Sequence, residues 1–138
     1  MSDRAILIEK FMTKNLITIG LDTELKQVAS LFETKQIHHL LVVDDDDKTL
    51  LGVVSDRDYL KHVSPNLGTT RYVWNDLQTL DQPVHKIMSR KLITLAPNNN
   101  LEDVINTFKK NKISCIPIVT QDKLLVGIVT WRDLLNLI

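Results

Sequence analysis

Apolar residues in the first half of the chain form two kinds of pattern, short runs and helical spacing. Short apolar runs cover 16–19, 39–43 and 50–55, and runs of this length between turn residues are typical of strands. Between the first two runs, apolar residues recur every three or four positions, which predicts a helix with one apolar face: Leu25, Val28, Ala29 and Phe32. A further short helix is expected from Asp56, so the predicted order is strand, helix, strand, strand, helix.

The same order of patterns returns in the second half. MTKNLITI at 12–19 matches MSRKLITL at 88–95, at an offset of 88 − 12 = 76 residues. After one deletion in a polar turn, the offset becomes 127 − 52 = 75, and GVVSDRD at 52–58 matches GIVTWRD at 127–133. Between these matches lie a second helical pattern and two strand-like runs: Leu101, Val104, Ile105 and Phe108, then 115–119 and 124–130. Matches in this order indicate an internal duplication.

The duplication predicts how the chain is organised. Each copy has about 50 residues, too few to bury most of its apolar surface alone, and its almost wholly apolar strands predict a sheet covered on both faces. We therefore expect a mixed α+β fold, in which two pseudo-symmetric repeats pack sheet to sheet with helices outside and two equivalent clefts between them. The expected boundaries are 1–62 for the first repeat with its N-terminal segment, 63–83 for a linker and 84–138 for the second repeat.

Two local predictions refine this outline. Thr23 or Asn99 is expected to cap the long helix of its repeat, because threonine and asparagine are favoured at the N-cap. In the linker, residues 72–80 are expected to form a short helix with one apolar side: Trp74, Leu77 and Leu80.

The composition limits the functions that the chain can have. Among its 138 residues, Lys plus Arg equal Asp plus Glu at 17 each. This balance argues against a broad basic face for nucleic acid, although it is compatible with a local basic pocket. No apolar run is long enough to span a bilayer, and the N-terminus lacks the pattern of a secretory signal peptide. The single cysteine, Cys115, excludes an internal disulfide and fits the reducing cytoplasm, where we expect the protein.

Ser55-x-x-Asp58 and Thr130-x-x-Asp133 lie where the last strand of each copy meets the following helix, and two interpretations fit them. The first is a capping box, in which hydroxyl and carboxylate satisfy the first amides of the helix. The second is a ligand site, because a helix N-terminus favours phosphate and a carboxylate can accept both hydroxyls of a ribose. A glycine three residues before each hydroxyl would leave room for a close neighbour. The two interpretations are compatible, and both stay open.

These residues give the chain a resemblance to a tandem cystathionine-β-synthase (CBS) domain pair, also called a Bateman module. The resemblance rests on MTKNLITI and MSRKLITL, on the IPIV run at 116–119, and on glycine-apolar-x-Ser/Thr-x-x-Asp in both copies. It implies a regulatory module that binds AMP, ADP, ATP or S-adenosylmethionine in the clefts between the copies, as a regulatory ligand and with no cofactor. The family often has proline early in the second strand. Pro117 matches, but the first copy has Leu41, so equal binding in both clefts does not follow.

The resemblance also implies roles for individual residues. Asp58 and Asp133 would hold ribose hydroxyls, and Ser55 and Thr130 would lie near the phosphates. The adenine would be walled by residues near the first and second strands of each copy: Ile17, Thr18, Ile37, His39, Leu40, Ile93, Thr94, Ile113, Cys115, Ile116 and Pro117.

Other charged residues have simpler interpretations. Arg57 and Arg132 either pair with nearby acids on the helix surface, or contact phosphate or a second subunit. His38 and His39 are adjacent in a strand and would point to opposite faces, so we expect no metal site there. The acidic run 44–47 lacks the ligand spacing of a calcium loop and is interpreted as a solvated turn.

No catalytic set of residues emerges, since phosphate-binding loops and nucleophile motifs are absent from the sequence. We therefore expect a sensor rather than an enzyme, with two alternatives: a non-binding dimerisation scaffold and a nucleotide hydrolase. The signal is expected to pass in trans, to an effector protein or through the homodimer that the resemblance implies. Apolar residues on flanking segments are candidates for the dimer contact: Ile6, Phe11, Tyr59, Leu134 and Leu137.

Overall fold

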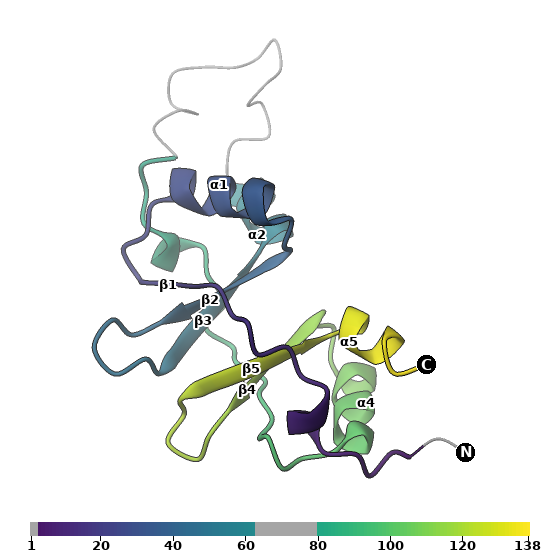
Figure 1. The fold of residues 1–138 in the computed structure, drawn as a ribbon. Coiled ribbons are helices and arrows are strands. Elements are labelled where there is room, and N and C mark those ends of the chain that lie inside the picture. Colours follow the sequence, from purple (N-terminus) through teal and green to yellow (C-terminus); the bar gives the residue numbers. More distant parts are fainter. Residues whose placement is uncertain (1–2, 63–79) are drawn as a thin grey trace. The chain divides into compact units, whose positions relative to one another are not determined.

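A computed structural model of the chain describes residues 3–62 and 80–138 (Figure 1). The described residues form two compact units, each with its own apolar core. The described residues of the first-repeat unit are 17–46, 51–62 and 80–92. Those of the second-repeat unit are 3–16, 47–50 and 93–138. Each unit combines helices with a small sheet, which confirms the predicted mixed α+β class.

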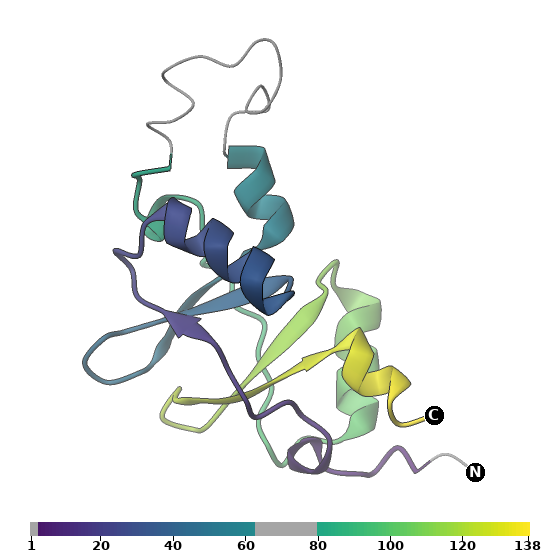
Figure 2. The same ribbon diagram turned by 45° about the horizontal axis from the view of Figure 1, so that its top comes forward.

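The first-repeat unit is built from three strands and two helices: β1 Thr18–Ile19, β2 His39–Val43, β3 Leu50–Ser55, α1 Leu25–Lys35 and α2 Asp56–His62. The strand order is β1-β2-β3, and β1 runs parallel to β2 with Thr18 opposite Leu41. Helices α1 and α2 pack against each other (Figures 1 and 2). Leu25 and Val28 are buried and Phe32 packs on the same core, as their helical spacing predicts.

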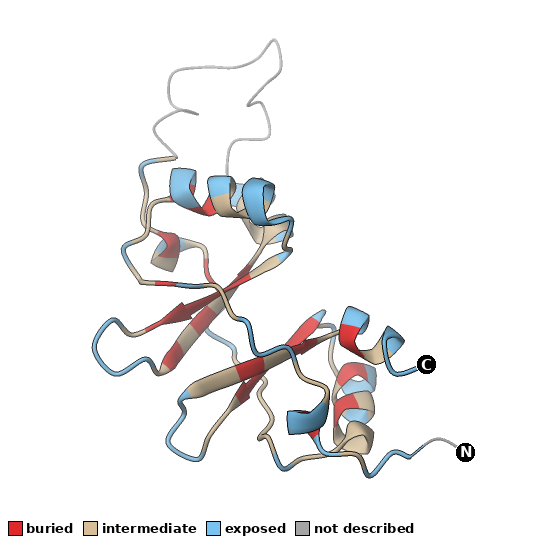
Figure 3. Cartoon of the chain, viewed as in Figure 1, coloured by how far each residue is buried: buried red, intermediate tan, exposed pale blue. Residues whose placement is uncertain are grey.

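The second-repeat unit has one hairpin and two helices: α4 Leu101–Lys110, β4 Cys115–Val119, β5 Leu125–Thr130 and α5 Trp131–Leu135. Strands β4 and β5 are antiparallel, with Cys115 opposite Thr130 and a bulge after Ile118. Val104 and Phe108 of α4 are buried against the hairpin. Figure 3 shows buried residues along the strands and on one side of α4.

The segment before each repeat's first strand belongs to the unit of the other repeat. Residues 8–16 begin with the 3₁₀ helix η1, Ile8–Lys10, and Thr13 then exchanges two main-chain hydrogen bonds with Ile128 of β5. Residues 84–92 begin with η2, Val84–Lys86, and Ser89 exchanges two such bonds with Val53 of β3. The boundaries expected from the sequence divide the chain into consecutive repeats. In the structure, by contrast, the segment before each repeat's first strand packs with the other repeat.

Most of the predicted strands appear where the apolar runs placed them. The runs at 39–43, 50–55 and 115–119 match β2, β3 and β4 residue for residue, and α2 starts at Asp56 as predicted. Residues 92–95, the second-copy counterpart of the run at 16–19, form no named strand: Leu95 pairs through a single bridge to Ile118. The helix expected over 72–80 lies, apart from Leu80, outside the described residues.

The predicted helix caps were wrong by one residue. The N-caps of α1 and α4 are Glu24 and Asn100, and each forms a capping box with the residue three positions later. The side chains of Thr23 and Asn99 instead accept main-chain hydrogen bonds from residues three positions before them. They therefore close the turn that leads into the helix, a role that the same residue types favour.

Candidate functional site

The junction between β3 and α2 contains the first predicted hydroxyl and acid. Ser55 precedes the first residue of α2, and the Asp58 amide donates to the Ser55 hydroxyl at 3.0 Å. The Ser55 amide donates in return to Oδ2 of Asp58, also at 3.0 Å. The capping interpretation is confirmed here. We find no hydrogen bond from another described residue to Oδ1 of Asp58, which is part-buried.

The junction between β5 and α5 repeats this arrangement and adds one contact. The amide of Thr130 donates to Oδ2 of Asp133 at 2.9 Å, and the Thr130 hydroxyl lies 3.5 Å from the same oxygen. The hydroxyl of Thr13 donates to Oδ1 of Asp133 at 2.7 Å. Asp133 is only 8% exposed and is the one charged residue in the buried set of the described chain. Its burial is compatible with these bonds, because a buried carboxylate needs hydrogen-bond partners.

The glycine before each hydroxyl has a structural reason that sequence reasoning missed. A β-carbon on Gly52 would lie 2.6 Å from the sulfur of Met88 and 3.0 Å from the carbonyl oxygen of Ser89. A β-carbon on Gly127 would collide with the sulfur of Met12. The close neighbour of each glycine is therefore a methionine of this chain, and the glycines are explained without a ligand.

The start of each repeat's second strand lies beside its junction. In the first-repeat unit, the amide of Asp56 donates to the carbonyl of His38 at 2.9 Å, just before β2. In the second-repeat unit, Cys115 at the start of β4 lies opposite Thr130. Predicted adenine-wall residues therefore adjoin Ser55 and Thr130 within their own units.

The predicted wall residues differ in what their side chains can contact. Leu40 and Ile116 are fully buried in the two cores, and Pro117 is also buried. Five others are half-buried or pack against the cores: Ile17, Ile37, His39, Ile93 and Ile113. Thr18 is exposed in β1, while Thr94 lines a pocket at a different place. A ligand at either junction would therefore meet main chain rather than the side chains of Leu40 or Ile116.

His39 and Cys115 occupy matching positions, 115 − 39 = 76 residues apart, and burial shifts the pKa of both side chains. Burial lowers the pKa of His39 from its ordinary value, against a smaller raising effect of Asp56 and Asp58. Burial raises the pKa of the Cys115 thiol to about 12. Both side chains are consequently uncharged near neutral pH. Cys115 is a free thiol and is buried.

The charged residues around the junctions differ between repeats. His38 Nδ1 lies 2.9 Å from Oδ2 of Asp56. The counterpart of Asp56 is Trp131, whose ring stacks on Phe108 with centroids 4.8 Å apart. Arg57 and Arg132 are exposed and form no ion pair with another described residue.

Among the described residues, no group of three or more His, Cys, Asp or Glu residues is arranged to hold a metal ion. Among residues 3–62 and 80–138, no helix is long and apolar enough to cross a membrane.

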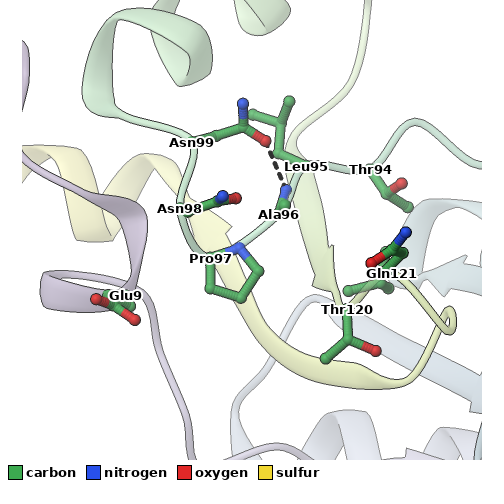
Figure 4. A pocket seen from close by; sticks show the side chains of 10 residues that line it. Glu9, Thr94, Leu95, Ala96, Pro97, Asn98, Asn99, Thr120 and Gln121 are labelled. Atoms are coloured by element: carbon green, nitrogen blue, oxygen red, sulfur yellow. Dashed lines mark hydrogen bonds between the residues drawn. The ribbon is translucent and has the colours of Figure 1, made fainter.

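An open pocket of about 650 Å³ lies at the other end of β4 (Figure 4). It is lined by Glu9, residues 94–99 and residues 119–121, and Figure 4 shows Pro97 and Thr120 facing it. Val119 and Cys115 are four residues apart along β4, so the pocket is roughly 13 Å along the strand from Thr130. No lysine or arginine lines it, so it lacks a cationic partner for phosphate, and Thr94 is its only predicted site residue.

Of the five apolar residues predicted for a dimer contact, three pack into cores. Tyr59 packs on the first-repeat core, and Phe11 and Leu134 pack on the second-repeat core. Ile6 is half-buried, and Leu137 is exposed. The most exposed large apolar residues of α2 and α5 are others: Leu60, Trp131 and Leu135.

Comparison with known proteins gives consistent matches. The CBS domain family model matches residues 8–65 and 84–138. The structure of CBSX2 in complex with AMP is 27% identical, with a TM-score of 0.79, covering 95% of this chain and 94% of that chain. The CBS domain pair of protein MJ0100, in complex with 5-methylthioadenosine and S-adenosylmethionine, is 25% identical, with a TM-score of 0.76 and coverages of 96% and 95%.

Some curated relatives are much longer than this chain. A homoserine O-acetyltransferase of Methanococcus vannielii is 28% identical over 132 residues, which are 96% of this chain and 25% of that enzyme. The chain therefore spans a quarter of the length of this relative.

Proposed function

Because the chain belongs to the CBS domain family, we propose that it is a regulatory module that binds an adenosine-containing ligand and transmits binding to a partner. The observation that carries the proposal is the pair of strand-to-helix junctions, where a hydroxyl residue and an aspartate occupy matching positions in both repeats. Two similar structures support it, since CBSX2 was solved in complex with AMP and the CBS domain pair of MJ0100 in complex with 5-methylthioadenosine and S-adenosylmethionine. These three ligands share an adenosine, so purine and ribose contacts should dominate recognition.

The ribose is assigned to the aspartates. A carboxylate offers about four acceptor positions, enough to cap a helix and accept the two hydroxyls of a ribose. Asp58 supports this role, because one of its oxygens accepts the Ser55 amide while the other accepts nothing from the described residues. The ligand would thus use a carboxylate that the fold already holds in place.

The adenine is assigned to the start of β2 and β4. His39 and Cys115 are uncharged there near neutral pH, which suits a neutral purine better than a phosphate. When the ligand carries phosphate, the hydroxyls of Ser55 and Thr130 and the exposed guanidinium groups of Arg57 and Arg132 are the nearest candidates for it.

A ligand-free scaffold is the second candidate function. Two observations favour it. Both capping boxes are complete without a ligand, and contact with a methionine explains why a glycine is needed at each of positions 52 and 127. An enzyme is not proposed, because the junction residues form capping bonds rather than an activated nucleophile and base.

Transmission of the signal is proposed to occur in trans through a homodimer and an effector protein. The exposed apolar side chains of Leu60, Trp131 and Leu135 on α2 and α5 are the candidates for these contacts. A reducing cytoplasm is the proposed compartment, in keeping with the single buried thiol.

The proposal is tested by titration calorimetry of the full chain with AMP, ADP, ATP and S-adenosylmethionine. A sensor binds at least one of them, and Asp58→Asn weakens that binding while the far-ultraviolet circular dichroism spectrum stays unchanged. Absence of binding by all four ligands would favour the scaffold. Incubation with ATP and magnesium tests the hydrolase alternative, and release of phosphate above the level of a Ser55→Ala, Asp58→Asn variant would contradict the sensor.

A further inference from the structure

The hydroxyl of Thr13 donates a hydrogen bond to the carboxylate of Asp133, and no described residue makes the equivalent contact with Asp58. Thr13 donates to Oδ1 of Asp133 at 2.7 Å, an ordinary distance for an O–H···O hydrogen bond. The repeat counterpart of Thr13 is Ser89, which is 89 − 13 = 76 residues later. Ser89 pairs with β3 through its main chain, but its hydroxyl forms no hydrogen bond with another described residue.

The remaining acceptor capacity of the two carboxylates therefore differs. Asp133 accepts Thr13 on one oxygen, and on the other it accepts the Thr130 amide at 2.9 Å and the longer hydroxyl contact at 3.5 Å. Two of these contacts are short hydrogen bonds, one on each oxygen, whereas 3.5 Å is too long for a full O–H···O bond. A ribose diol that bridges the two oxygens of Asp133 therefore has to compete with Thr13 for Oδ1. Asp58 accepts one described donor, the Ser55 amide, and keeps room for a diol.

We infer that Thr13 is a specificity-determining residue that gives the two aspartates different affinities for a ribose. The ribose binds more tightly to Asp58 at the first-repeat junction than to Asp133 at the second-repeat junction. This inference rests on the proposed binding of an adenosine ligand. A ligand at Asp133 has to break the Thr13 contact before it can bind through both hydroxyls. Because a hydrogen bond to a charged group contributes roughly 1.5–3 kcal/mol, the lost contact weakens binding at Asp133 by roughly tenfold or more.

Two variants at position 13 separate the hydroxyl from the packing around it. Thr13→Val keeps the branched shape and removes the donor, whereas Thr13→Ser keeps the donor and removes the methyl group. Ser89→Ala is the matched control, because it removes the hydroxyl at the equivalent position of the other repeat. Each is made in the full chain and titrated with AMP, alone and combined with Asp58→Asn or Asp133→Asn.

In the wild-type protein, AMP binding is expected to depend on Asp58 and to change less than twofold in Asp133→Asn. Thr13→Val is expected to tighten binding at the second junction by roughly tenfold, and Asp133→Asn is expected to cancel that gain. Thr13→Ser and Ser89→Ala should behave like the wild type. The inference is overturned if Thr13→Val leaves binding unchanged, or if wild-type binding depends equally on both aspartates. Absence of AMP binding in every variant would instead overturn the proposed function together with this inference.

The contact itself is tested without a ligand, by a double-mutant cycle of Thr13→Val and Asp133→Asn in urea unfolding. Thr13→Val is expected to lower the unfolding midpoint in the wild-type background and to have a smaller effect in the Asp133→Asn background. Equal effects in the two backgrounds would show that Thr13 does not engage Asp133 in solution and would overturn the inference even if AMP binds.

Discussion

Met88 lies against Gly52 so closely that a β-carbon on the glycine would be 2.6 Å from the methionine sulfur. Met12 and Gly127 form the matching pair of the other unit. Each methionine belongs to the segment before the first strand of one repeat, and each glycine belongs to the hairpin of the other repeat. The conformation of each hairpin therefore depends on a segment far away in sequence, which is a physical route by which the two repeats stabilise each other.

Substitution of either glycine by alanine is expected to destabilise the protein. Gly52→Ala should lower the free energy of unfolding by about 1–3 kcal/mol. The added β-carbon would clash with the buried side chain of Met88 and with the main-chain carbonyl oxygen of Ser89, which can shift only if the backbone moves. Gly127→Ala should cost less, because the atoms it meets all belong to the half-buried side chain of Met12. Equilibrium unfolding in urea measures both changes.

A second substitution controls for the effect of alanine on the strand itself. In a Met12→Ala background, Gly127→Ala should become less costly, because the obstructing side chain is gone. An unchanged cost in that background would mean that the glycine is required for another reason, such as close approach of a bound ligand.

Local sequence patterns predicted the strands and the helix faces well, because those depend on alternation and spacing within one segment. The pairing of Thr13 with β5 and of Ser89 with β3 could not be predicted this way. Nothing in the local pattern of 12–19 shows which hairpin it joins. One pattern did carry information about this pairing. Each copy has a methionine followed by a hydroxyl residue (12–13 and 88–89), and each copy also has a glycine and an aspartate at matching positions. In the structure, each methionine contacts the glycine of the other copy, and one of the two hydroxyls contacts an aspartate.

The candidate site was only partly accessible from sequence for a similar reason. Spacing alone predicted the Ser55–Asp58 capping box, and the structure confirms it. It gave no indication that Asp133 has a further partner at position 13, because that contact joins residues 120 positions apart. Likewise, the one-residue error at Thr23 arose because threonine is favoured both in turns and at N-caps.

The stability of the protein is expected to fall as pH decreases through the titration range of His39. Burial lowers the pKa of His39 in the native state, so below its ordinary value of 6.5 the unfolded chain binds a proton that the native protein excludes. The loss is at most about 1.4 kcal/mol per pH unit, the limit for one proton. Urea unfolding between pH 7.5 and about 5.5 measures it. His39→Gln should show a shallower dependence, and the same slope in both proteins would contradict the assignment.

The thiol of Cys115 is expected to be unreactive in the native protein. Its pKa of about 12 leaves a very small thiolate fraction at pH 8, and the thiolate is the nucleophile. Labelling with iodoacetamide at about pH 8 should be at least a hundredfold slower in native conditions than in urea, by order of magnitude. Rapid stoichiometric labelling of the native protein would show that the start of β4 is open to solvent.

The central claim is that a junction aspartate binds a ribose through its hydroxyls, and the choice of nucleotide tests it most directly. Titration with AMP and with 2′-deoxy-AMP compares two ligands that differ by one hydroxyl. We predict that the wild-type protein binds AMP at least about tenfold more tightly than 2′-deoxy-AMP, and that Asp58→Asn removes most of this preference. Equal affinity of the wild-type protein for the two nucleotides would contradict the claim.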